Sequence, residues 1–333
     1  MTDKQSVLAA LDHKQTYPVP YQIDFTVPAF AKMAEYYGND SFHRDLLNNC
    51  FYGTMADLPE AEIEPGIYKD AFGSIWNKTV DQDIGVVENV VVTSENLADY
   101  QFPDLESPQV YQFTRDRVAK NPDKFIVYYL AFSLYERSWV LAGMETVLMS
   151  MAADPEFVHS LLDRILEYNL VQIENACAAG VDAIWIGDDW GQQTGLIMGP
   201  AHWREFIKPR IKVMYDAVKA RGKKVIIHCC GKVDEILPDL IEVGVDLFNP
   251  FQPEVMDVYQ VKKQFGKEIA FWGGISTQQL LPFGTPDQVR EEVKRLLDKI
   301  GQDGGYIAAP AHSIPGDAKP ENIAAMIEVL NDQ

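Results

Sequence analysis

The sequence predicts an α/β fold, a single (β/α)₈ TIM barrel domain over residues 1–333, and three observations support this prediction. The second half of the chain alternates short apolar segments with amphipathic ones, at the spacing of βαβ units. A chain of 333 residues without a long linker suits one such barrel. Ionisable residues follow directly after the apolar segments, which is where barrel enzymes carry their chemistry.

Seven segments are expected to be strands, because each is nearly continuous in apolar residues, as strands buried on both faces are. They are residues 19–24, 125–130, 183–187, 224–229, 246–249, 269–272 and 306–309. Residues 50–104 differ, since Gly and Pro interrupt their short apolar stretches. We expect them to form an insertion of extra strands or loops near the barrel mouth.

Three helices between these strands have clear start and stop residues. Asp154 and Thr285 are N-cap residues, each followed by a proline suited to the first helical turn. Glycines follow each helix and are expected to end it. The predicted helices run over residues 155–179, 199–220 and 286–300.

The composition is that of a globular protein, with 47% hydrophobic and 23% charged residues. The net charge of −20 argues against nucleic acid or an anionic membrane as a partner, because phosphates attract basic surfaces. The sequence contains no apolar run long enough to span a bilayer and no secretion signal at its start. The four cysteines show no disulfide pattern, so we expect a cytoplasmic, reducing location.

The most informative motif is His228-Cys229-Cys230, at the end of the strand predicted over residues 224–229. Side chains alternate along a strand, so His228 and Cys230 point to the same face. Imidazole and thiolate are ligands that zinc prefers. The pair therefore indicates a metal site, although a buried histidine beside an inert cysteine would give the same pattern.

His312 follows the last predicted strand and is the candidate third metal ligand. Three protein ligands leave one coordination position for substrate or water, which distinguishes a catalytic zinc from a structural one. Prolines at 310 and 315 flank this histidine, so a purely structural role in shaping the loop is the alternative.

Four further residues at strand ends are candidate catalytic groups, namely Asp24, Tyr129, Asp188 and Asp189. Adjacent aspartates cannot both point into the barrel if the strand continues through them. One of Asp188 and Asp189 could therefore bind substrate or orient a ligand imidazole. A turn or helix-start aspartate is the structural alternative for each carboxylate. Trp190, Asn249 and Gln252 stand at similar positions and are candidate substrate-binding residues.

Several signatures of other enzyme classes are missing. The chain has no Gly-rich dinucleotide loop after its first strand, no Walker loop and no Gly-x-Ser-x-Gly elbow. It also lacks an Asp-x-His-x-x-Gly motif of the corrinoid-binding type. Any corrinoid would therefore be carried by a separate protein.

The chain resembles the uroporphyrinogen decarboxylase superfamily over nearly its whole length. The matching motifs occur in the same order in both, and they are residues 7–14, 18–20, 188–191, 203–210, 228–231, 244–250 and 304–323. The resemblance implies a single (β/α)₈ barrel of the uroporphyrinogen decarboxylase type. It also implies one of two chemistries, decarboxylation or zinc-dependent methyl transfer with a corrinoid protein.

Two departures distinguish these chemistries. The decarboxylases carry arginines for the substrate carboxylates near the N-terminus, whereas residues 21–32 contain no arginine. The methyltransferases, such as those that methylate coenzyme M from methylcobalamin, carry His-x-Cys and a distant cysteine. His228 and Cys230 match the first part, but His312 stands at the position of the distant cysteine. A set with one thiolate fewer is a harder Lewis acid, better suited to an oxygen substrate.

The resemblance therefore implies a zinc-dependent methyltransferase that moves a methyl group between a small substrate and a corrinoid protein. A methoxylated compound is the favoured substrate, as in anaerobic O-demethylation, and a thiol is the alternative. Two other functions stay open. One is a metal-free decarboxylase or lyase that acts on a smaller carboxylate through Asp24 and His312, and the other is a barrel that has lost catalysis but still binds a corrinoid protein.

Overall fold

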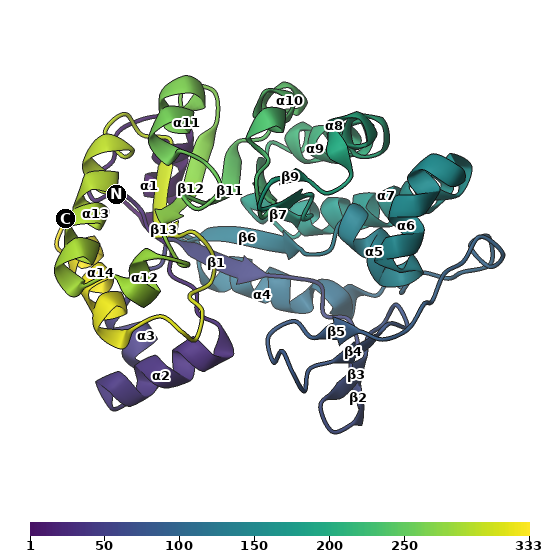
Figure 1. Cartoon of the computed structure of the whole chain (residues 1–333), viewed down its shortest axis with the longest axis horizontal. Coiled ribbons are helices and arrows are strands. Elements are labelled where there is room, and N and C mark those ends of the chain that lie inside the picture. Colours follow the sequence, from purple (N-terminus) through teal and green to yellow (C-terminus); the bar gives the residue numbers. More distant parts are fainter.

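The computed structural model describes residues 1–333 and is built around a curled parallel sheet of seven strands. Neighbouring strands in the sheet follow one another in the order β1, β6, β7, β10, β11, β12 and β13, and every adjacent pair is parallel. Helices flank the central strands (Figure 1). The strand bounds are β1 Phe51–Thr54, β6 Phe125–Leu130, β7 Ala183–Gly187, β10 Lys224–His228, β11 Leu247–Phe251, β12 Ala270–Ile275 and β13 Tyr306–Pro310.

The segment around Tyr21 lies between the two edge strands and closes the barrel. The Gln22 N–H donates to the Ala308 carbonyl of β13 at 3.0 Å, and on the other side the Cys50 N–H donates to the Tyr21 carbonyl at 3.0 Å. The regular strand predicted over residues 19–24 is nevertheless wrong, since only isolated bridges form there. Pro20 has no N–H to donate, which interrupts the ladder.

The helices between the strands include all three that the caps predict. Asp154 accepts the Phe157 N–H, and Thr285 forms a capping box with Gln288. A π-helical turn at Trp203–Ile207 joins α8 to α9. The helix bounds are α1 Asp3–Leu11, α2 Val27–Tyr37, α3 Phe42–Leu46, α4 Gln112–Lys120, α5 Tyr135–Ala142, α6 Met144–Ala153, α7 Pro155–Ala178, α8 Gly199–His202, α9 Lys208–Ala220, α10 Leu237–Val243, α11 Val258–Phe265, α12 Leu280–Phe283, α13 Pro286–Lys299 and α14 Pro320–Asn331. None of these helices is both long and apolar enough to cross a membrane.

The predicted insertion is present, but it begins later than expected. Residues 51–54 form the barrel strand β1, in which Gly53 faces the Tyr129 ring so closely that a Cβ would clash with it. The insertion then forms a separate antiparallel sheet, whose strands are β2 Ala61–Glu64, β3 Ile67–Lys69, β4 Ile75–Asn77 and β5 Val86–Val87. It projects beyond β1 in Figure 1. A short hairpin, β8 Gly191–Gln192 and β9 Gly195–Leu196, follows β7.

Helix α1 closes the end of the barrel at which the strands begin. Its residues Val7, Ala10 and Leu11 are buried in one apolar cluster with residues from inside the barrel, such as Phe125 and Ile226. A second, larger cluster packs the helices onto the outside of the sheet. Because one end is sealed, a ligand reaches the barrel interior from the carboxyl ends of the strands.

Candidate functional site

Three potential metal ligands converge at the carboxyl ends of the strands. His228 is the last residue of β10, Cys230 lies two residues further, and His312 follows the end of β13. One donor atom from each of these residues lies within 4.8 Å of the other two. The Cys230 Sγ and His228 Nε2 atoms are 3.4 Å apart. Two nitrogens and one sulfur at this separation suit a single ion of zinc type.

The orientation of the His228 ring is fixed by a chain of two hydrogen bonds. The Asn249 amide nitrogen donates to the Trp272 carbonyl at 3.2 Å, which points the Asn249 Oδ1 atom at His228 Nδ1, 2.6 Å away. Nδ1 therefore carries the proton, and the Nε2 lone pair faces Cys230. This arrangement is typical of metal-binding histidines, whose second nitrogen is held by an oxygen acceptor.

Two carboxylates, Asp189 and Glu136, act on the Cys230 thiol through their charges. Asp189 Oδ1 accepts the Cys230 N–H at 2.8 Å and lies 3.9 Å from His228 Nε2. Burial and the neighbouring Asp189 charge raise the pKa of the Cys230 thiol. Burial, followed by the charges of Asp189 and Asp188, raises the pKa of Glu136 well above its ordinary range. A thiolate at this position is therefore stable only beside a compensating cation.

A cavity of about 350 Å³ adjoins His228 and His312, two of the three ligand candidates, and takes a small molecule. Its walls carry no Lys or Arg and include Asp24, Tyr129, Trp185, Trp272, His228 and His312. Enclosure by protein raises the pKa of the Asp24 carboxyl, although a hydrogen bond from the Gln22 amide at 2.9 Å opposes this. Burial likewise lowers the pKa of His312. Asp24 and Tyr129, both predicted from their strand ends, thus share one cavity with His228 and His312.

Asp188 and Trp190 occupy a different position from the one we expected. Asp188 is fully buried and accepts the N–H groups of Tyr135 and Glu136, at 3.0 and 2.8 Å, as a cap for α5. The Trp190 indole donates to the same carboxylate at 2.6 Å and has no exposed surface. Burial raises the pKa of Asp188 to about 7. Neither side chain can contact a ligand, because the chain after β7 turns both into the core.

Cys230 and His312 also line a shallower cleft of about 470 Å³ on their other side. Gln252 contributes to its wall, and its Oε1 atom accepts the Gly231 N–H at 2.7 Å. Gln252 thereby holds the loop that carries Cys230, and its predicted substrate contact stays a prediction. Asn249 likewise supports His228, while its side chain still borders the inner cavity. His228 thus lines the inner cavity, Cys230 lines the shallower cleft, and His312 lines both.

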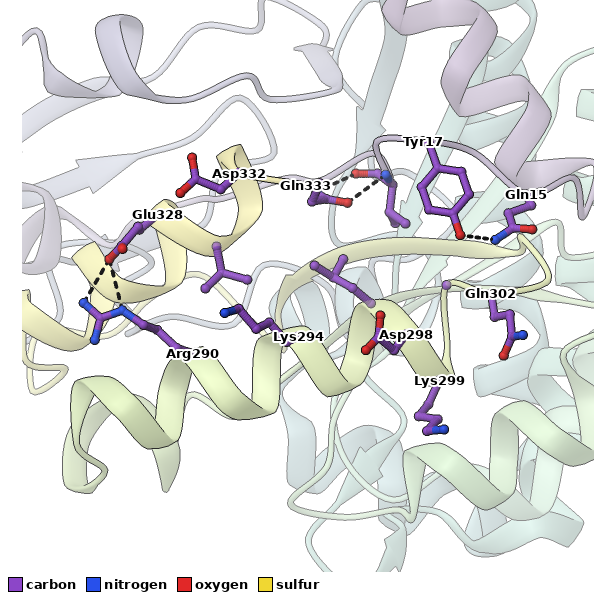
Figure 2. Close-up of a pocket in the computed structure, with 14 residues that line it drawn as sticks. Gln15, Tyr17, Arg290, Lys294, Asp298, Lys299, Gln302, Glu328, Asp332 and Gln333 are labelled. Carbon is purple, nitrogen blue, oxygen red and sulfur yellow. Dashed lines mark hydrogen bonds and ion pairs between the residues drawn. The ribbon is translucent and has the colours of Figure 1, made fainter.

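The largest cleft, of about 720 Å³, lies at the opposite end of the barrel, between α13, α14 and the loop before Tyr21. Some of its polar groups bond to one another. Figure 2 shows Arg290 paired with Glu328 and Gln15 bonded to Tyr17. None of the metal-ligand candidates lines this cleft.

The sequence analysis missed Glu136, whose charge also raises the pKa of the Cys230 thiol. Glu136 stands in the first turn of α5, where an acidic residue usually interacts only with the helix dipole. Trp185 was also missed, because it lies within β7 like an ordinary core residue. Its ring packs 4.8 Å from the His228 ring and lines the cavity.

Comparison with known proteins gives a consistent family. The family model for Uroporphyrinogen decarboxylase (URO-D) matches residues 77–333. The uroporphyrinogen decarboxylase of Chlorobaculum parvum is 25% identical over 284 residues, covering 78% of this chain and 77% of that protein. The one from Chlorobium phaeobacteroides is 28% identical over 191 residues, so this chain spans about half (51%) of that relative. A solved structure of a methyltransferase from Methanosarcina mazei is 18% identical to this chain. The match covers 100% of this chain and 99% of that chain, with a TM-score of 0.73. That likeness shows the fold.

Proposed function

Since the chain belongs to the uroporphyrinogen decarboxylase family and carries two imidazoles and a thiol at one point, we propose that it is a zinc-dependent methyltransferase. In this proposal it moves a methyl group between a small substrate and a corrinoid held by a separate protein. The observation that carries the proposal is the convergence of His228, Cys230 and His312 within 4.8 Å. The name of the structural neighbour from Methanosarcina mazei, a methyltransferase, supports the same reading.

The donor set fits zinc by type and by number. Two imidazoles and one thiolate are usual zinc ligands, and three of them leave a fourth position for a substrate heteroatom. Zinc bound here would supply a Lewis acid that polarises the substrate heteroatom. With only one thiolate the site favours oxygen over sulfur, so a methoxylated compound is the preferred substrate.

The chain's own residues would position the metal ligands and supply the proton that the leaving oxygen takes up. Asn249 fixes the His228 ring, and Asp189 holds the backbone of Cys230. In transfer from an ether, a reduced corrinoid would accept the methyl group, and the C–O electron pair would stay on the substrate oxygen. That oxygen would take up a proton, for which Asp24 in the cavity wall is a candidate donor. The two-sided access to the ligands lets substrate and corrinoid approach from different clefts.

A second candidate function is a metal-free decarboxylase or lyase that uses Asp24 and His312. Their shared cavity and the raised pKa of Asp24 favour it, as do the names of the relatives. Uroporphyrinogen itself is a poor fit, because its carboxylates would meet no Lys or Arg in the cavity wall.

Metal analysis combined with a methyl-transfer assay separates the two candidates. Wild type is expected to hold about one zinc per chain, and Cys230→Ser is expected to lose both zinc and methyl transfer to free cobalamin. Cys229→Ser is the matched control, since Cys229 is buried and its sulfur accepts the Trp190 N–H instead. The proposal fails if wild type purified without chelator holds no zinc. It also fails if Cys230→Ser keeps full activity.

A further inference from the structure

A fourth cleft, of about 390 Å³, lies between the inserted sheet and the start of α5. Its walls are mainly apolar, with Leu58, Phe72, Trp76, Ile84 and Phe132 among them. Phe132 follows the carboxyl end of β6, so the cleft stands at the same end of the barrel as His228. None of its lining residues belongs to the cavity of the metal-ligand candidates.

One charged side chain in this cleft has no hydrogen-bond partner. Arg137 is 9% exposed, and its Nη1 atom is sealed from water without a partner. The nearest carboxylate oxygen, Asp70 Oδ2, is 3.8 Å away, beyond hydrogen-bond distance. Asp70 instead accepts the N–H groups of Phe72 and Ser74 and the indole of Trp76. A buried guanidinium without hydrogen bonds is costly, so its position requires an explanation.

The aromatic side chains around Arg137 hold it at the cleft. Its Cζ atom lies 3.7 Å from the Phe72 ring centroid and 5.7 Å from that of Phe132, which are cation–π distances. Phe132 adopts a φ of +52°, in the left-handed region that a bulky residue rarely occupies. Its ring packs edge-on against Trp76 at 5.3 Å. Backbone strain of this kind is typical of ligand-binding positions.

We propose that this cleft binds a flat, apolar ligand that bears a single carboxylate, with Arg137 as the anion-binding residue. A guanidinium offers two parallel N–H groups to a carboxylate, and the apolar walls suit an aromatic body. Glu60, Asp70 and Asp83 outnumber Lys78 and Arg137 around the cleft, so a doubly charged phosphate would meet net repulsion. The site lies outside the proposed zinc centre, and the inference holds whether or not zinc binds.

Calorimetric titration of the full chain with benzoate tests the inference, with benzyl alcohol and inorganic phosphate as comparison probes. Benzoate is expected to bind at least about tenfold more tightly than benzyl alcohol or phosphate, because only benzoate combines a single negative charge with an aromatic ring. Arg137→Met should weaken benzoate binding about tenfold or more, and Arg137→Lys should weaken it less. Arg204→Met is the control, since it removes an equal charge from the Asp239 pair outside the cleft.

Three results would overturn the inference. The first is no heat of benzoate binding at about 10 mM ligand. The second is unchanged binding in Arg137→Met. The third is benzyl alcohol that binds as tightly as benzoate. If Arg137→Met does not fold, Arg137→Lys and the comparison of the three probes on wild type still decide the question.

Discussion

The two ends of the barrel carry clefts of opposite character. The larger one, about 720 Å³, lies where the strands begin, and its charged side chains, among them the Arg290–Glu328 pair, are spread along two helices (Figure 2). The smaller one, about 350 Å³, lies where the strands end, and His228 and His312 in its wall converge with Cys230. The difference teaches that convergent donor atoms identify the chemical site better than the size of the cleft.

The connectivity of the barrel produces this difference. Helix α1 seals the starting end with Val7, Ala10 and Leu11, so ligands cannot reach the interior from there. The charges of the larger cleft come mainly from α13 and α14, which pack side by side and pair across their interface. At the other end, β10 and β13 and the residues just after them bring His228, Cys230 and His312 together, with Asp189 3.9 Å from His228 Nε2.

Changes to the three ligands should have the largest effect. His228→Ala and Cys230→Ser are expected to lower methyl transfer at least about a thousandfold, because a catalytic metal supplies several kcal/mol of transition-state stabilisation. Lys294→Met in the larger cleft should leave the rate unchanged. Rates measured with free cobalamin, alongside circular dichroism to check folding, provide the comparison. An equal loss of methyl transfer in Lys294→Met would show that the two ends of the barrel do not differ in their importance for activity.

Loss of the Asp188 carboxylate should reduce the stability of the fold, and not only the catalytic rate. Asp188→Ala leaves two backbone N–H groups of α5 and the Trp190 indole buried without an acceptor. We expect the free energy of unfolding to fall by about 3–5 kcal/mol, as measured by urea denaturation. Asp188→Asn keeps one acceptor oxygen and should lose about half as much. An unchanged midpoint in Asp188→Ala would show that these bonds do not stabilise α5.

Removal of the group that supports His228 should have an intermediate effect. Asn249→Ala frees Nδ1 of His228, so the ring loses its fixed orientation. Zinc affinity, measured by competition with a chromogenic chelator, is expected to fall about 10–100-fold. Gln333→Ala, which removes a comparable amide contact to Val19 in the larger cleft, is the matched control and should leave zinc affinity unchanged. A zinc affinity of Asn249→Ala equal to that of wild type would contradict the supporting role.

The smallest effect is expected in the larger cleft itself. Arg290→Ala and Glu328→Ala break an ion pair that is largely exposed, with side chains 35% and 54% accessible. Each should change the free energy of unfolding by less than about 1 kcal/mol. The double variant should behave as the sum of the two within about 0.5 kcal/mol, because the coupling between exposed charges is weak. A larger coupling would mean that this cleft is an organised site.

The barrel strands were predictable where they are long and apolar, and the failures have physical causes. The segment around Tyr21 closes the barrel, but Pro20 prevents a regular hydrogen-bond ladder. The apolar pattern of this segment therefore predicted a regular strand that does not form. The strand β1 was missed because it has only four residues and contains Gly53. A glycine is needed at this position because the Tyr129 ring leaves no room for a Cβ atom. Neither the irregular segment around Tyr21 nor the short strand β1 can be predicted from the sequence without knowing which segment packs beside it.

The candidate site was predictable from side-chain alternation at one strand end and from strand ends meeting at one end of a barrel. That reasoning brought His228, Cys230, His312 and Asp24 to one place. It could not decide between Asp188 and Asp189, since their directions depend on how the chain turns after β7. Glu136 and Arg137 escaped notice because they begin an amphipathic helix, where charged residues are usually solvated.

The most direct test of the central claim is the zinc K-edge absorption spectrum of the purified protein. We predict a first shell with one sulfur at about 2.3 Å and two imidazole nitrogens at about 2.0 Å, with a light atom in the fourth position. Cys230→Ser should lose the sulfur contribution, and Cys229→Ser should keep it. A shell without sulfur, or protein that binds no zinc at all, would contradict a metal centre built from His228, Cys230 and His312.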